Sequence, residues 1–218
     1  MIKYAIFDMD GTVLDTERLM RDAWMETGRK WNLDKIGDVY VRIVGRNFET
    51  ACNLLKMQYG EDFPAKKFFA ERMALYFEMI KNSVPVKKGS KELLEYLRSN
   101  GIKTALATSS DLYVAKDNLR KTGFTELFDA IVAGDMVKNS KPAPDIFIEA
   151  GNRIGADPCE TIVCEDAYTG IEAAVSAKMM PIFVEDMLPP IDNIVNQSFA
   201  VCSDLLEVIE IIKKENKI

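Results

Sequence analysis

The 218-residue chain contains no histidine, and this absence excludes several large groups of catalytic sites. A Ser-His-Asp triad, a histidine-ligated zinc ion and a histidine acid–base relay all need an imidazole. Any catalysis must therefore use carboxylates, hydroxyls, amines or thiols. An excess of positive charge is also lacking, because the net charge is −6. Surfaces that bind nucleic acid are basic, so we expect no nucleic-acid partner.

Cysteines are few, and no two of them form a CxxC pair. We interpret the four as small core hydrophobes in a reducing cytosol, namely Cys52, Cys159, Cys164 and Cys202. The opening MIKYAIFDMD reaches acidic residues too early for a signal peptide, and no apolar run approaches the roughly 20 residues that span a bilayer. We therefore expect a cytoplasmic monomer without a membrane partner.

What the chain does contain is a series of short apolar runs that alternate with amphipathic stretches. The runs are bounded by Gly, Asp, Ser or Pro and predict buried parallel strands at residues 5–7, 103–107, 130–133, 161–164 and 181–184. The amphipathic stretches predict helices at residues 90–100, 112–122, 144–154, 169–178 and 204–215. This alternation predicts an α/β fold with a doubly wound, Rossmann-like parallel sheet.

Residues 16–82 interrupt this alternation. No strand is predicted there, and helix-like stretches lie around residues 16–30, 47–58 and 65–81. The simplest interpretation is a helical cap domain of residues 16–82, inserted into an α/β core domain of residues 1–15 and 83–218.

Two acidic residues, Asp8 and Asp10, follow the first predicted strand directly. Ligands of open α/β sheets bind at the carboxyl ends of the strands, which is where these side chains would lie. An ordinary acidic turn is one alternative, and a calcium-binding loop starting at Asp8 is the other. That loop would have Val13 at its glycine position and Leu19 at its terminal glutamate position, so the sequence argues against it.

Hydroxyl groups and a lysine occupy two further turns. Thr108, Ser109 and Ser110 end the strand at 103–107, where hydroxyls and free amides can cradle an anion. The caps of ordinary helices have the same composition, so this interpretation does not stand alone. Lys141 precedes Pro142, which restricts its backbone to an extended conformation. A lysine held in this way suits a fixed anion, although a surface turn explains it equally well.

Glu165 and Asp166 follow the strand at 161–164. Adjacent carboxylates at the end of a buried strand are unfavourable unless they bind a cation. Like charges about 4 Å apart repel by roughly 4 kcal/mol at an effective dielectric near 20. If the strands are neighbours, Asp8 and Asp10 join this cluster. Hard oxygen ligands of this kind suit Mg²⁺, which predicts a magnesium site.

Together these motifs resemble the haloacid dehalogenase (HAD) superfamily, nearest to its beta-phosphoglucomutase-like and phosphoglycolate-phosphatase-like members. The resemblance is carried by Asp8-x-Asp10, Thr108, Lys141-Pro and Glu165-Asp166 in this order, and by the stretches FDMDGTVLDTE, KPAPDIF and EDAYTGIEAA. It covers nearly the whole chain and implies a helical cap in the interrupted region.

The resemblance implies a role for each catalytic and phosphate-binding residue. Asp8 is the expected nucleophile, which takes the phosphoryl group as an aspartyl-phosphate. Asp10 is the expected general acid–base. Thr108 and the amide of Ser109 are expected to bind the phosphate, and Lys141 to neutralise the nucleophile and the phosphoryl oxygens.

The same resemblance implies the metal ligands. Asp8, the backbone carbonyl of Asp10, and Asp166 are expected to hold Mg²⁺, with Glu165 adjacent. A cation and a fixed lysine would offset the repulsion between an attacking carboxylate and a phosphate dianion. These residues predict a Mg²⁺-dependent phosphatase that hydrolyses a small phosphorylated metabolite.

Three departures bear on the activity. The dehalogenating members of the superfamily lack the second aspartate, which here is Asp10, so dehalogenation is disfavoured. The mutases have a histidine at the position of Met20 and an asparagine at the position of Leu112. Losing both groups argues against a sugar-phosphate mutase, which stays the first alternative. A catalytically silent binding module is the second alternative, and retention of all four motifs argues against it.

The cap residues that would contact the substrate are less specific in the sequence. Arg46 and Arg72 are the candidates for binding a distal anionic or hydroxylated group, and Lys81 is a further guess.

Overall fold

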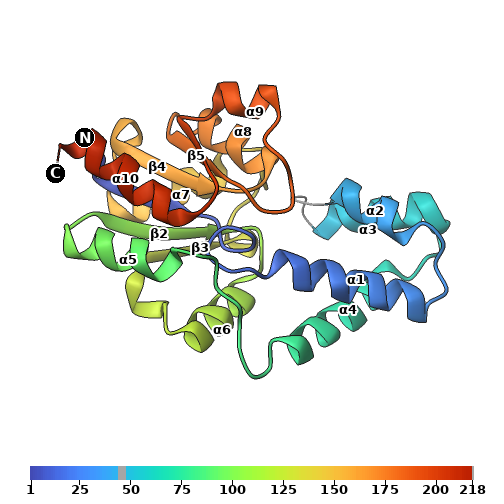
Figure 1. Cartoon of the computed structure of the whole chain (residues 1–218). Coiled ribbons are helices and arrows are strands. Elements are labelled where there is room, and N and C mark those ends of the chain that lie inside the picture. The colour runs from blue at the N-terminus through green and yellow to red at the C-terminus, as the bar shows by residue number, and fades with distance from the viewer. Residues whose placement is uncertain (44–47, 218) are drawn as a thin grey trace.

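The sheet predicted from the apolar runs is present and is parallel throughout. A computed structural model describes residues 1–43 and 48–217 (Figure 1). Along the sheet the order is β3 (Ala130–Ala133), β2 (Lys103–Thr108), β1 (Tyr4–Phe7), β4 (Thr161–Glu165), β5 (Met180–Val184) and β6 (Ala200–Cys202). The predicted fold class is therefore confirmed. β6, which has three residues, was not predicted.

Helices cover both faces of the sheet. One face packs against α5 (Ser90–Ser99), α6 (Leu112–Thr122) and α10 (Leu205–Asn216). The other face packs against α7 (Asp145–Ile154) and α8 (Tyr168–Ser176), and α9 (Asp192–Gln197) packs beside α8. Three short 3₁₀ turns lie at Thr125–Leu127, Gly134–Met136 and Pro158–Glu160. Both termini lie at the same end of the molecule (Figure 1).

The strands are apolar on both sides because both faces of the sheet are covered. Along β1, Ala5 and Phe7 belong to the cluster on one face and Ile6 to the cluster on the other, as the two-residue period of a strand requires. All three side chains are fully buried. β1 is the central strand, so the residues that follow it lie between those that follow β2 and β4.

After β1, residues 16–82 form what we call the helical insert, whose described part contains four helices. They are α1 (Glu17–Lys30), α2 (Ile36–Ile43), α3 (Phe48–Tyr59) and α4 (Ala65–Met79). The insert has its own hydrophobic cluster around the fully buried Trp24, which is separate from the clusters of the sheet. Trp24 Nε1 donates a hydrogen bond of 3.0 Å to the carbonyl of Ile36, which ties α1 to the start of α2.

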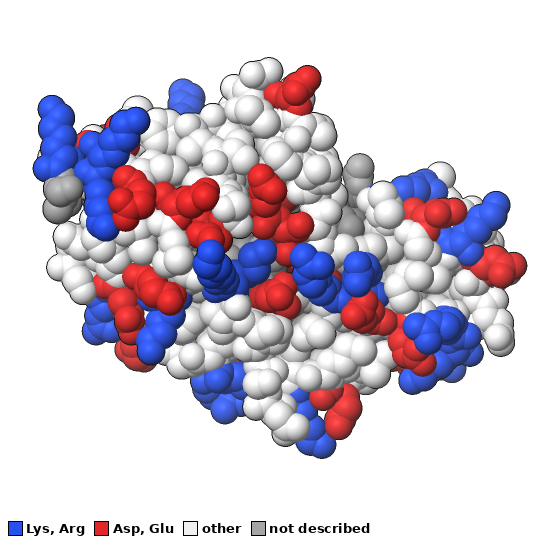
Figure 2. Space-filling view, in the orientation of Figure 1, with Lys and Arg blue, Asp and Glu red and all other residues white. Residues whose placement is uncertain are grey.

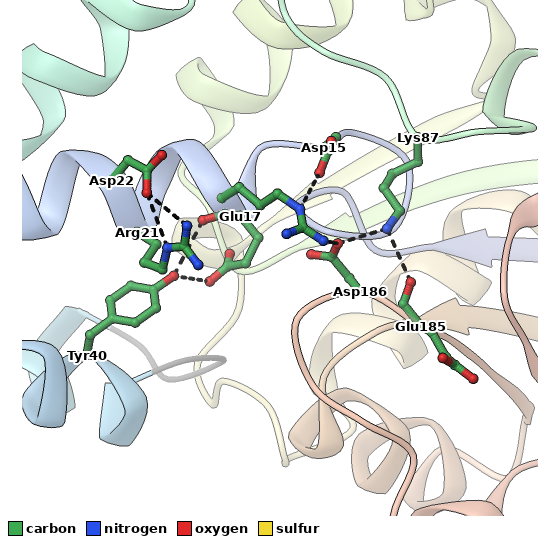
Figure 3. A network of polar contacts seen from close by, with 9 residues as sticks. Asp15, Glu17, Arg21, Asp22, Tyr40, Lys87, Glu185 and Asp186 are labelled. Atoms are coloured by element: carbon green, nitrogen blue, oxygen red, sulfur yellow. Dashed lines mark hydrogen bonds and ion pairs between the residues drawn. The ribbon is translucent and has the colours of Figure 1, made fainter.

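The chain leaves the core and returns to it at the same place. The amide of Asp15 donates to the carbonyl of Pro85 at 3.0 Å, and the amide of Lys87 donates to the carbonyl of Val13 at 3.1 Å. Beside this junction, Lys87 Nζ lies 2.9 Å from the buried carboxylate of Asp186 (Figure 3).

Arg18 joins the junction from the insert, with its guanidinium 3.7 Å from the same Asp186 oxygen. Basic and acidic side chains are interspersed over the visible face of the molecule (Figure 2). Across the described ranges 1–43 and 48–217, every helix is too short or too polar to cross a membrane.

Candidate active site

The turn after β1 places Asp8 and Asp10 at the carboxyl end of the sheet. The amide of Asp8 donates to the carbonyl of Cys164 at 3.0 Å, which continues the pairing of β1 with β4 by one residue. The chain then turns sharply at Gly11, whose φ of +89° favours glycine. A Cβ built on Gly11 would lie 2.3 Å from Asp166 Oδ2, so a glycine is also needed for space.

Lys141 links the ends of β1 and β4. Its Nζ lies 2.5 Å from Asp8 Oδ1 and 2.5 Å from Glu165 Oε1, and its side chain is 3% exposed. Burial lowers the pKa of the lysine. The two carboxylates outweigh this effect and hold its pKa above the ordinary value. Lys141 is therefore a buried, fixed cation and not a lysine of a surface turn.

The carboxylate of Asp8 is buried in the same place. Burial raises its pKa, and the charge of Lys141 opposes the rise. The nearby charges of Glu165 and Asp10 raise it further. The site thus holds more negative charge than Lys141 alone offsets.

Asp10 is held by two hydroxyl groups, one from the helical insert and one from the turn after β2. Thr16 Oγ1 donates to Asp10 Oδ1 at 2.5 Å, and Ser110 Oγ donates to Asp10 Oδ2 at 2.8 Å. Burial raises the pKa of Asp10, while these two hydrogen bonds lower it. A carboxyl group with a raised pKa is suited to give up a proton and take it back near neutral pH.

Glu165 has both carboxylate oxygens engaged. Oε1 contacts Lys141, and Oε2 accepts a hydrogen bond of 2.6 Å from the amide of Ala167. A Cβ built on Gly170 would lie 1.9 Å from Oε1, so the carboxylate rests directly on the first turn of α8. This arrangement makes Glu165 a positioning residue for Lys141. Its predicted place beside the metal stays a prediction.

Asp166 is 6% exposed and less well compensated. Its Oδ1 accepts a hydrogen bond of 2.8 Å from Thr12 Oγ1. Burial raises its pKa well above the ordinary value, and the charges of Glu165 and Asp8 add to the rise. A carboxyl group in these surroundings stays charged only beside a cation and otherwise takes up a proton.

This surplus of buried negative charge fits Mg²⁺. Within the described residues, no three His, Cys, Asp or Glu side chains form a ready-made metal cluster. The predicted ligand set does not require three, because it uses the carboxylates of Asp8 and Asp166 and the carbonyl of Asp10. Mg²⁺ commonly binds through one or two carboxylates and fills its remaining positions with water and substrate oxygens.

All the predicted core residues line one cavity of about 550 Å³, and Arg72 lines it from the insert. The core residues are Asp8, Asp10, Thr108, Ser109, Lys141, Glu165 and Asp166. Thr108 is buried, and its Oγ1 accepts a hydrogen bond of 3.1 Å from the amide of Ser110.

The remaining insert candidates do not add to this site. Arg46 lies outside the described residues. Lys81 pairs with Glu78 on the surface at 3.3 Å and is not among the residues that line the cavity.

Sequence reasoning missed the part that five polar residues play in the site, although it had named Ser110 as part of an anion cradle. They are Thr12, Thr16 and Ser110, which bind the carboxylates of Asp166 and Asp10, and Glu17 and Tyr40, which line the cavity from the insert. The hydroxyl residues stand within the motif stretches DGTVLDT and TSS, so their presence beside the acids was a usable signal. Nothing in the sequence links Tyr40 to Glu17.

The family assignment follows from this geometry and from sequence comparison. The sequence profile of the haloacid dehalogenase-like hydrolases matches residues 5–184. The chain therefore belongs to this family of hydrolases, and within it the chain is a phosphoric monoester hydrolase.

Three relatives illustrate the range of the family. The chain is 32% identical to a phosphorylated carbohydrates phosphatase of Thermotoga maritima over 82% of each sequence. It is 34% identical to the fructose-1-phosphate phosphatase YqaB of Escherichia coli, over 80% of this chain and 92% of that protein. Its structure is similar to the crystal structure of a beta-phosphoglucomutase from Clostridium difficile, with a TM-score of 0.83 and 25% identity. That match covers 100% of this chain and 98% of the mutase. The predicted superfamily and enzyme class are confirmed.

Proposed function

We propose that this protein is a Mg²⁺-dependent phosphatase that hydrolyses a small phosphorylated metabolite through an aspartyl-phosphate. One observation carries the proposal: the carboxylates of Asp8 and Asp10 line a single cavity, and each is fixed differently. Asp8 is fixed by a cation, Lys141, and Asp10 by two neutral hydroxyls. Carboxyl groups in such different surroundings are suited to different chemical roles.

In the first step, a carboxylate oxygen of Asp8 attacks the phosphorus and the bond to the leaving oxygen breaks. Lys141 holds the carboxylate in place and offsets its repulsion from the phosphate dianion. Protonated Asp10 gives its proton to the leaving oxygen, which departs as an alcohol. Thr108 and the amide of Ser109 would hold the phosphoryl oxygens.

In the second step, Asp10 takes a proton from a water molecule as that water attacks the phosphorus of the aspartyl-phosphate. The acyl phosphate bond breaks, inorganic phosphate leaves, and both aspartates return to their starting states. The helical insert would act as a cap that limits the entry of water until the substrate is bound.

Asp8, Asp166 and the carbonyl of Asp10 would hold the metal. When bound, Mg²⁺ supplies positive charge that lowers the repulsion between the nucleophile and the phosphoryl group.

The surplus of buried negative charge predicts that the stability of the metal-free protein decreases as the pH rises. Burial raises the pKa of Asp8 to about 8 and that of Glu17 to about 7. Between about pH 6 and pH 8 the folded state therefore binds more protons than the unfolded state, so stability falls as the pH rises. We expect the free energy of unfolding in EDTA to be about 3–4 kcal/mol higher at pH 6 than at pH 8.

Thermal unfolding in EDTA measures this difference, and adding Mg²⁺ at pH 8 should restore the lost stability. Asp166→Asn should abolish the gain from Mg²⁺, whereas Asp62→Asn, in an exposed loop, should keep it. A stability that rises with pH in EDTA, or wild-type protein that does not respond to Mg²⁺, would refute the metal site.

A phosphomutase is the alternative that the structural likeness keeps open. Met20 lines the cavity at the position where the resembling mutases have a histidine. A thioether cannot move a proton, so it cannot gate Asp10 in favour of a sugar hydroxyl over water. This supports hydrolysis.

The choice between the two activities can be tested with β-glucose 1-phosphate. We expect that, if it is turned over, it yields glucose and inorganic phosphate at equal rates. Glucose 6-phosphate should not accumulate when a bisphosphate activator is added. A coupled glucose-6-phosphate dehydrogenase assay, run beside a phosphate-release assay, measures both products. A bisphosphate-dependent dehydrogenase signal without phosphate release would establish the mutase instead.

A further inference from the structure

The part of the cavity wall that the insert supplies carries polar side chains, and three that are not exposed come from three different helices. Glu17 is the first residue of α1, Tyr40 lies in α2 and Arg72 lies in α4. All three line the same cavity as Asp8 and Asp10. The proposed chemistry uses none of the three, so their arrangement bears on what occupies the rest of the cavity.

Glu17 and Tyr40 form a fixed pair. Tyr40 Oη donates a hydrogen bond of 2.6 Å to Glu17 Oε1 (Figure 3). Burial raises the pKa of Tyr40, and the neighbouring charge of Glu17 raises it further, so the hydroxyl stays protonated and remains a donor. This bond orients the Glu17 carboxylate at the start of α1 and leaves it with acceptor capacity, since a carboxylate can accept up to about four hydrogen bonds.

Arg72 carries a positive charge opposite to that of Glu17, and its Nε–H is an available hydrogen-bond donor. Its Nε is buried and has no hydrogen-bond partner among residues 1–43 and 48–217. Burial lowers the pKa of the guanidinium, and the charges of Glu17 and Asp10 oppose this. Glu17 therefore already offsets part of the positive charge that Arg72 would otherwise offer to an anion.

Together the pair and the arginine offer acceptors and donors with little net charge. Hydroxyl groups both donate and accept, so they can satisfy the Glu17 carboxylate and the free Arg72 donor at once. A second phosphate or a carboxylate would meet the negative Glu17 in a partly buried cavity, where repulsion is stronger than in water. Lys66, the other lysine or arginine that the described part of the insert contributes to the wall, is exposed.

We propose that Glu17 is a specificity-determining residue that selects phosphate esters of uncharged, hydroxylated alcohols and excludes esters that carry a second anionic group. This inference rests on the phosphatase function proposed above and names its substrate class. The selection acts through charge, because a carboxylate and its amide isostere differ in charge but not in shape.

The test compares two competitors of p-nitrophenyl phosphate hydrolysis, D-glucitol 6-phosphate and 6-phospho-D-gluconate. They differ only at the end distant from the phosphate, which is a CH₂OH group in one and a carboxylate in the other. Burial raises the pKa of Glu17 to about 7, so the assay is run at about pH 8, where Glu17 is ionised. We expect the wild-type inhibition constant to be at least about tenfold higher for the gluconate.

Glu17→Gln keeps an acceptor for Tyr40 and removes the charge, so it should bring the ratio of the two inhibition constants close to one. Glu26→Gln is the matched control, because Glu26 lies in the same helix and forms a surface ion pair with Arg29. The control should keep the wild-type ratio. An unchanged ratio in Glu17→Gln would overturn the inference.

The wild-type measurement decides the matter even if Glu17→Gln fails to fold. A wild-type ratio near one, or a preference for the gluconate, contradicts selection by charge. So does the failure of both compounds to compete while p-nitrophenyl phosphate is hydrolysed. If the wild-type protein releases no phosphate from any of these esters, the phosphatase function itself fails, which is a different result.

Discussion

Replacing Asp8 with asparagine is expected to lower kcat by at least about a thousandfold while leaving the protein folded. An amide is a poor nucleophile, and the neighbouring carboxylate of Glu165 is engaged with Lys141 and Ala167. The fold should persist, because the variant replaces a buried carboxyl group, whose pKa is raised, with a neutral amide of the same shape. Lys141 keeps its contact with Glu165.

Phosphate release under saturating substrate measures the loss, and thermal unfolding measures the stability. Asp62→Asn, which removes a carboxylate from an exposed loop, should match the wild-type protein in both. If Asp8→Asn retains more than a few per cent of the wild-type kcat, the covalent mechanism is wrong.

Lys141→Met is expected to have the largest effect on stability. The substitution leaves the carboxylates of Asp8 and Glu165 buried without their cation. Breaking a buried ion pair from one side in this way costs about 3–5 kcal/mol. Activity should be lost with it, because the nucleophile is no longer held. The free energy of unfolding in urea measures the cost, and Lys138→Met, an exposed lysine three residues away, provides the control.

The pH dependence of stability gives this prediction a second measurement. Burial already raises the pKa of Asp8, and removing Lys141 takes away the positive charge that opposes the rise. In the variant, the folded state therefore takes up a proton more readily than the unfolded chain, so its stability should increase from about pH 8 to pH 6. A loss of stability below about 1 kcal/mol at pH 8 would show that Lys141 is not the main partner of these carboxylates.

The sequence was informative about the sheet because buried parallel strands are continuous apolar runs. The runs at 103–107 and 161–164 became β2 and β4, beside β1, as the clustering of the acids required. The helices α2 and α9 were not predicted. α9 has six residues, too few to show a helical period, and α2 follows α1 closely within a region read only as helix-like.

The predicted site residues come together because each stands at the end of a strand or in the turn after it. The hydrogen bonds that join them could not be read from the sequence. Thr12 contacts Asp166 across 154 positions of the chain, and Ser110 contacts Asp10 across 100. Glu165 was grouped with the metal ligands on its adjacency to Asp166. Its two engaged oxygens depend on the path of α8, which adjacency does not reveal.

The paired crossing at Val13–Asp15 and Pro85–Lys87 makes the helical insert a module that can be exchanged. Because the chain departs and returns through adjacent hydrogen-bonded segments, a replacement needs only two ends that lie side by side. Asp8, Asp10 and Lys141 stay on the core side of that crossing, whereas Thr16, Glu17, Tyr40 and Arg72 belong to the insert. A replacement insert that kept Thr16 could therefore change the side chains that face the far part of the cavity while Asp8, Asp10 and Lys141 stay in place.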